Sequence, residues 1–113
     1  MQIHLDTTTK SLEVDLAGAI TTNQLEVQTN AIDLLDSDQT VSEVLNTVIV
    51  TNNTTAVMAM AAPASGHTRV VKSITVFNAD TVAATPSIQI NANGTIYRIA
   101  KQVLAVDETL TID

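Results

Sequence analysis

The sequence predicts an all-β fold, an antiparallel, jelly-roll-like β-sandwich of about eight strands with an extended N-terminal arm. Apolar and polar residues alternate over several short runs, which is typical of strands that bury one face. Asn, Asp, Gly and Pro separate these runs at a spacing of roughly ten residues, as turns between strands require. The hydrophobic fraction is 45% but the aromatic fraction only 2%, so aliphatic residues must fill the core.

Residues 1–40 are expected to form the N-terminal arm and the first strands. Alternation is regular over residues 11–17, where acidic side chains occupy the positions between the apolar ones. Gly18 favours a bend, and alternation then resumes over residues 24–35. The polar residues 36–40 indicate a turn at the end of this region.

Residues 41–113 are expected to form the β-sandwich domain, and the whole chain one structural domain. A short helical turn over residues 41–45 competes with a strand, because Thr40 and Glu43 have the spacing of a capping box. The β-rich composition that follows favours the strand. Further strands are expected within residues 46–50, 56–62, 67–78, 86–91, 96–99 and 109–112.

Local signals predict details of these strands. The apolar positions change parity after Val71, so a β-bulge is expected near Val71 and Lys72. Pro86 suits the first residue of an outer strand, where its missing N–H is harmless. Asn93 followed by Gly94 is typical of a tight hairpin turn. Two methionines, Met58 and Met60, are expected to share a face as adaptable core side chains.

The charge distribution argues against direct binding to nucleic acid. The net charge is −7, and residues 1–43 carry eight acidic side chains against Lys10 as their one base. Residues 44–113 carry four acidic and four basic side chains. Nucleic-acid binding requires clustered Lys and Arg. We therefore expect a solvated acidic face, or a face that complements a basic partner surface.

The sequence predicts neither an enzyme nor a metal or cofactor site. It has no cysteine, and neither His4 nor His67 has a second metal-type residue at ligand spacing. Asp36 and Asp38 resemble the start of a calcium loop, but the required Gly and Glu of such a loop are missing. Catalytic pockets need convergent polar groups with shifted pKa values, and no motif of that kind occurs.

No membrane association is expected either. No apolar run reaches the roughly 18 to 20 residues that span a bilayer. The first ten residues lack the basic start and apolar middle of a signal peptide, so we expect a soluble protein that is not exported by that route.

Two stretches together resemble a group of small virion proteins of tailed bacteriophages. Those proteins have a leading LE-x-x-LAGA-x-T-x-Q-L segment before a β-domain with an Arg-x-Val-Lys strand, a V-x-N-x-DT loop, an NGT turn and a final LA-x-x-ETL turn. The matching positions here are Leu12, Glu13, 16–19, Thr22, Gln24, Leu25, 69–72, 76–81, 93–95 and 104–110. The match covers about two thirds of the chain, but residues 31–62 lie outside it.

The resemblance implies a structural role in a virion assembled in the bacterial cytoplasm. The expected function is that of a capsid cement or decoration protein, which binds the major capsid protein as a homo-oligomer, such as a trimer. Five apolar side chains of the front segment are then expected to lie at an interface between chains. They are Leu12, Val14, Leu16, Leu25 and Val27.

Three alternatives remain open from the sequence. A neck, tail or fibre-base component would belong to the same group of virion proteins. A carbohydrate-binding module belongs to a different class of function. The sequence argues against it, because sugars stack on aromatic faces and the chain has only Phe77 and Tyr97. The last alternative is a free cytosolic β-domain.

Overall fold

The computed structural model describes residues 2–113 and folds them into nine strands without a helix. In chain order the strands are β1 (Ile3–Leu5), β2 (Lys10–Leu16), β3 (Glu26–Leu35), β4 (Val41–Val50), β5 (Val57–Met60), β6 (His67–Phe77), β7 (Pro86–Ala92), β8 (Thr95–Lys101) and β9 (Thr109–Ile112). Every strand pair is antiparallel. The predicted all-β sandwich is confirmed.

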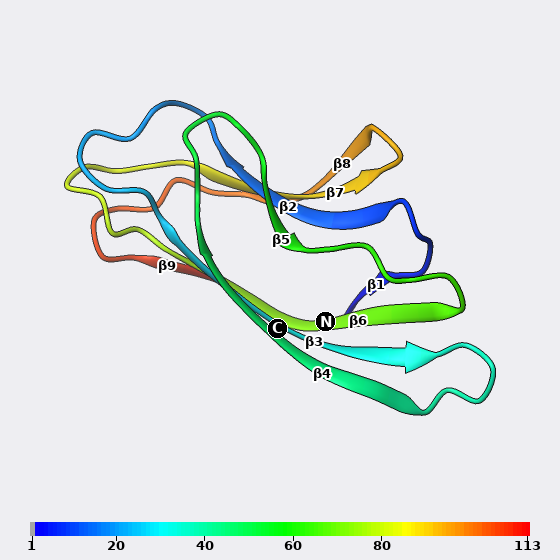
Figure 1. Ribbon diagram of the computed structural model, residues 1–113. Coiled ribbons are helices and arrows are strands. Elements are labelled where there is room, and N and C mark those ends of the chain that lie inside the picture. Colours follow the sequence, from blue (N-terminus) through cyan, green and yellow to red (C-terminus); the bar gives the residue numbers. More distant parts are fainter. Residues whose placement is uncertain (1) are drawn as a thin grey trace.

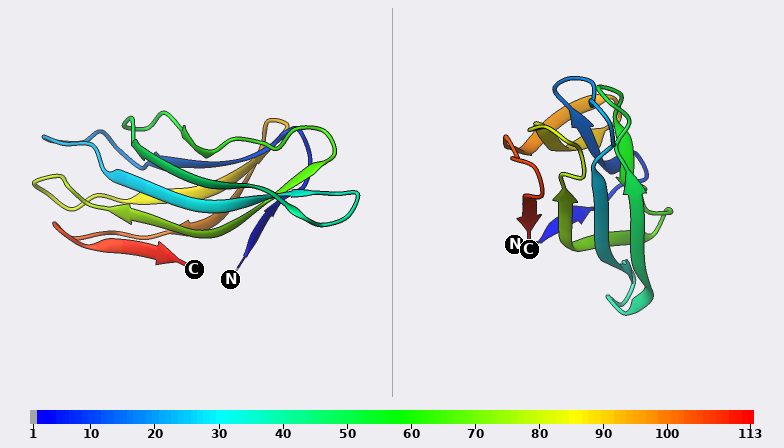
Figure 2. Two further views of the ribbon diagram at one scale, coloured as in Figure 1. Left: turned by 60° about the horizontal axis from the view of Figure 1, so that its bottom comes forward. Right: turned by 90° about the vertical axis from the view of Figure 1, so that its left-hand side faces the viewer.

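The strands form two sheets that pack face to face (Figure 1). Sheet A has the order β1-β6-β3-β4, and β9 also pairs with β6. Sheet B has the order β5-β2-β7-β8. β1 pairs with residues 69–71 of β6 and β9 with residues 74–77, so the two short strands lie end to end along one edge of sheet A (Figure 2). β4 forms the other edge of this sheet.

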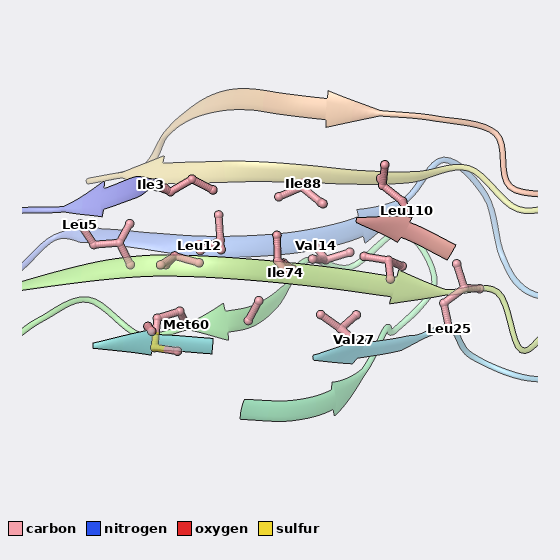
Figure 3. Packing of buried hydrophobic residues seen from close by; sticks show 14 of the residues in the cluster. Ile3, Leu5, Leu12, Val14, Leu25, Val27, Met60, Ile74, Ile88 and Leu110 are labelled. Carbon is pink, nitrogen blue, oxygen red and sulfur yellow. The ribbon is translucent and has the colours of Figure 1, made fainter. Parts of the chain in front are cut away.

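The core lies between the two sheets and consists of aliphatic side chains (Figure 3). Alternation along each strand sends every second side chain inward, and β-branched residues suit this position. Ile74 and Val76 of β6 and Ile88 of β7, for example, have no exposed surface, and Ile74 and Ile88 both lie in the space between the sheets (Figure 3). Burying one such side chain contributes roughly 1.5–3 kcal/mol, so the alternating pattern provides the main driving force for folding.

The five side chains expected at an interface between chains lie in this core instead. Their exposed fractions are 0% for Leu12, Val14 and Leu25, 1% for Val27 and 3% for Leu16. The apolar face of β2 packs against the other sheet of the same chain, and it is therefore not available to a second chain in this fold. The interface expectation is corrected accordingly.

The front of the chain belongs to both sheets and does not extend as an arm. β1 pairs with β6, and its side chains Ile3 and Leu5 are buried in the core. β2 lies in the interior of sheet B between β5 and β7. Strands from residues 2–40 and from residues 41–113 are neighbours in both sheets, so the two ranges build a single sandwich.

Two local predictions are confirmed by the strand register. Asn30 pairs with Ser73 and Ala31 with Val71, so Lys72 is an extra residue in β6 and forms the expected bulge. Ala92 pairs with Thr95, and both residues between them have positive φ, 53° at Asn93 and 91° at Gly94. This is the backbone of a type I′ turn, which Asn-Gly favours.

The strand favoured over residues 41–45 is confirmed, because these residues begin β4. Two other local predictions fail for reasons of register and sheet order. Pro86 does begin a strand, but β7 lies between β2 and β8 and is not an outer strand. A register shift at Ala59 between β2 and β5 puts Met58 and Met60 on different faces, so Met60 is buried and Met58 is 53% exposed.

Candidate interaction surface

Buried polar groups join the loops at one end of the sandwich, on the left in Figure 1. Asn78 has no exposed surface; its Nδ2 donates to three backbone carbonyls, and its Oδ1 accepts the backbone N–H of Asp80 at 3.0 Å. The three carbonyls belong to Val82 at 3.0 Å, Leu104 at 3.1 Å and Ala105 at 3.2 Å. The side chain thus connects the loop after β6 to the loop after β8.

Asp80 extends this network to the loop between β2 and β3. Its carboxylate accepts four backbone N–H groups, those of Thr21 at 2.9 Å, Thr22 at 2.8 Å, Asn23 at 3.1 Å and Thr81 at 2.8 Å. These hydrogen bonds, that of Thr21 foremost, hold the pKa of Asp80 well below its usual range although desolvation opposes them. The ionised carboxylate therefore fixes the end of the sandwich.

Some of the residues that carry the resemblance to phage proteins form hydrogen bonds within and between these loops. Asn78 and Asp80 are the central residues of the V-x-N-x-DT motif. Gln24, from the leading motif, accepts the hydroxyl of Thr51 at 2.9 Å and the backbone N–H of Asn53 at 3.1 Å. Glu108, from the final motif, accepts the backbone N–H of Ala105 at 2.6 Å. These motif residues hold loops in place.

Asp80 makes the stability of the fold depend on acid pH. The folded-state pKa lies below the ordinary value of 3.8, so the stabilisation is present above that value and is lost as the pH falls below it. We expect Asp80→Asn to be less stable than the wild type at neutral pH and to lose less stability between about pH 5 and pH 2. Urea unfolding across this range checks the prediction.

The matched control is Asp107→Asn. Asp107 is exposed and has φ 66°, a conformation that Asn also adopts readily. At neutral pH this variant should keep the stability of the wild type within about 0.5 kcal/mol. An Asp80→Asn protein with an unchanged slope would contradict the assigned role of the carboxylate.

At the opposite end of the sandwich, the buried side chain of Asp33 is paired with the side chains of His67 and Arg69. It accepts a hydrogen bond from Nδ1 of His67 and one from Nε of Arg69 at 3.1 Å. Burial alone would raise the pKa of Asp33, but these two partners outweigh it and hold the pKa below its usual range. Arg69 also donates to the carbonyl of Ala61 at 3.0 Å, so this cluster joins β3, β6 and the loop before β6.

The residues considered above for metal or sugar binding do not lie together in one site. Among residues 2–113, no group of three or more His, Cys, Asp or Glu side chains could hold a metal ion, and no helix is long and apolar enough to cross a bilayer. Phe77 lies in sheet A, whereas Tyr97, 59% exposed, lies in sheet B, so the two aromatic rings do not share a face.

The four sheet edges differ strongly in how they are protected. Proteins shield edges by short strands, by charged side chains and by bulges, because unpaired N–H and C=O groups can pair with another chain. The edge formed by β1 and β9 consists of strands of three and four residues, and β5 also has four. β8 is longer but carries Arg98 and Lys101, both exposed.

The β4 edge lacks most of this protection. β4 has ten residues, and Glu43 is its one charged side chain. Its bulge at Ser42 affects only the beginning of the strand. Four valines are exposed along it, Val41 by 56%, Val44 by 78%, Val48 by 70% and Val50 by 55%. A long edge strand with exposed β-branched side chains is suited to pairing with another strand. We therefore take the β4 edge as the candidate interaction surface.

The outer face of sheet A continues this surface. Val50, Glu26 and Phe77 are register neighbours across β4, β3 and β6. Val48, Gln28 and Thr75 form the next row, and the six side chains line a shallow, largely apolar groove. The groove places apolar surface directly beside the open edge.

Comparisons of the chain with protein-family models, with curated proteins and with solved structures find no match.

Sequence reasoning missed the β4 edge, although a signal was present. Over residues 44–50, apolar residues occur on both faces of the expected strand, and no residue in this range is charged. Such a run normally indicates a strand covered on both faces. Here one face is exposed, which leaves apolar side chains in contact with solvent at the edge of the sheet.

Proposed function

We propose that this chain is a bacteriophage virion structural protein that acts as a capsid cement or decoration protein and stabilises the head shell. The observation that carries the proposal is the β4 edge, which offers ten residues of strand and four exposed valines for pairing. Pairing through backbone hydrogen bonds joins folded β-domains without a pocket or a catalytic group. The phage context is supported by the motif resemblance.

The shape and charge of the molecule are compatible with this role. The molecule is elongated, 47 by 24 by 19 Å, and its loops at one end are fixed by Asn78 and Asp80. A rigid, acidic body of this kind can lie on a shell whose surface is basic, and the complementary charge would guide its docking. The partners in this proposal are the major capsid protein, which the acidic surface would contact, and a second copy of the chain, which the β4 edge would contact.

Copy number in purified particles tests the proposal. A decoration protein covers the shell, so we expect hundreds of copies per particle when the chain is quantified by mass spectrometry against the major capsid protein. A count of around a dozen would replace it with the alternative function, a neck, tail or fibre-base component. Absence of the chain from the particles would refute both virion roles.

A further inference from the structure

We infer that the partner of the β4 edge is a second copy of the same chain, paired β4 to β4 across a twofold axis at Asn46. The inference rests on the proposed function in so far as that function assigns pairing to this edge. Its evidence is the direction of the backbone groups, the pattern of side chains along β4 and the distribution of charge.

The backbone of β4 presents its even-numbered residues to the open side. The N–H of Thr51 donates to the carbonyl of Leu25 at 2.9 Å, so the odd-numbered residues of this strand direct their backbone groups toward β3. Strands alternate with a period of two, and the register between β3 and β4 is regular over residues 43–50. Val44, Asn46, Val48 and Val50 therefore direct their N–H and C=O groups away from the sheet.

One register makes this row complementary to itself. In an antiparallel pair centred on Asn46, Asn46 lies opposite the same residue of the second copy, and Val44 lies opposite Val48. A shift of the centre by one residue in either direction places Asn46 opposite a valine. The centred register thus matches apolar with apolar and amide with amide, as favourable cross-strand pairs do.

The outer face of sheet A continues across this pairing. Asn46 donates through Nδ2 to Oδ1 of Asn30, which donates to Oγ of Ser73 at 3.1 Å. A second copy would extend this row of amide hydrogen bonds through the axis into its own sheet. The two rows of valines would lie on either side of it.

Charge does not oppose the pairing at the strand itself, although each chain carries −7 overall. Glu43 is the one charged residue of β4, and in the centred register it lies opposite Ile49. The two Glu43 carboxylates would be separated by six residues along the strands, about 20 Å. That separation exceeds the Debye length of about 8 Å at physiological salt.

The absence of cysteine from the chain allows a direct test by disulfide trapping. Directly opposite residues in a hydrogen-bonded antiparallel pair have Cα atoms about 5.5 Å apart, within the range of a disulfide. We expect Asn46→Cys to form a covalent dimer under mild oxidation. We expect Val44→Cys or Val48→Cys alone not to do so, because each lies about 13 Å along the strand from its own copy.

A mixture of Val44→Cys and Val48→Cys should form the covalent heterodimer, which fixes the register. Analytical ultracentrifugation of the unmodified chain should show the mass rise from 12.0 kDa to twice that value with concentration. Val44→Lys/Val48→Lys, at two exposed positions, should keep the circular dichroism of the wild type and remain monomeric.

Three outcomes would overturn the inference. A chain that stays monomeric at all concentrations would leave the edge to a different protein. Equal trapping of all three cysteine variants would indicate random collision, and a dimer unaffected by the lysine variant would lie elsewhere. These results are obtained with the purified chain, so they are independent of the copy number that tests the virion role.

Discussion

Asn78→Ala is expected to lower the free energy of unfolding by about 3 kcal/mol. Two of the three carbonyls that Asn78 holds keep a second partner, because Leu104 also accepts the N–H of Ala84 and Ala105 that of Glu108. The N–H of Asp80 and the carbonyl of Val82 would each lose the hydrogen bond to the Asn78 side chain. Urea unfolding followed by circular dichroism measures the change.

Two further variants separate hydrogen bonding from packing. Asn78→Asp keeps the shape but cannot donate, and it adds a charge beside the Asp80 carboxylate, so it should destabilise at least as much as Asn78→Ala. Asn52→Ala, at an exposed loop position, should change stability by less than about 0.5 kcal/mol. If Asn78→Ala stays within the same limit, the network does not hold this end of the fold.

Leu12→Ala is also expected to lower the free energy of unfolding by about 3 kcal/mol, within the range of roughly 2–5 kcal/mol for such a truncation in a core. Leu12 is fully buried between the sheets, and its removal leaves a cavity that the sandwich can close only in part. Thermal or urea unfolding of the monomer checks the prediction.

Val44→Ala is the control, because Val44 is 78% exposed, and its effect on monomer stability should be below about 0.5 kcal/mol. Comparison of Leu12→Ala with Val44→Ala shows whether Leu12 lies in the core of one chain or at an interface between chains. If Leu12 lay between chains, Leu12→Ala would leave the monomer stable and weaken only its association.

The strands could be predicted from the sequence because their signals are local. Alternation identified β2, β3 and β6, a change of parity identified the bulge at Lys72, and Asn93 with Gly94 identified the hairpin turn. In each case a few neighbouring residues are sufficient to decide the backbone conformation.

What covers an apolar face could not be predicted, because that depends on residues distant in sequence. Alternation shows that Leu12 and Val14 share a face, but it does not show whether another sheet or another chain meets that face. The same limit applies to Pro86, whose strand became an inner one through pairing with both β2 and β8. The free edge of β4 follows from this sheet order as well.

The polar network was also beyond the sequence alone. Asn78 and Asp80 lie in the V-x-N-x-DT motif, and five of the eight hydrogen bonds described for their side chains reach residues 26 to 59 positions away along the chain. Both side chains are buried and satisfied by backbone groups of other loops. Their motif could be recognised as a pattern, but its structural reason appears only when the loops are brought together.

The central claim is that the β4 edge joins this chain to an assembly, and its occupancy on phage particles tests this most directly. Particles should be assembled in the presence of either the wild-type chain or Val44→Lys/Val48→Lys, and the bound copies counted per major capsid protein. The account predicts that the wild type binds in hundreds of copies and that the equally folded variant loses most of this binding. Equal occupancy of the two proteins would contradict it.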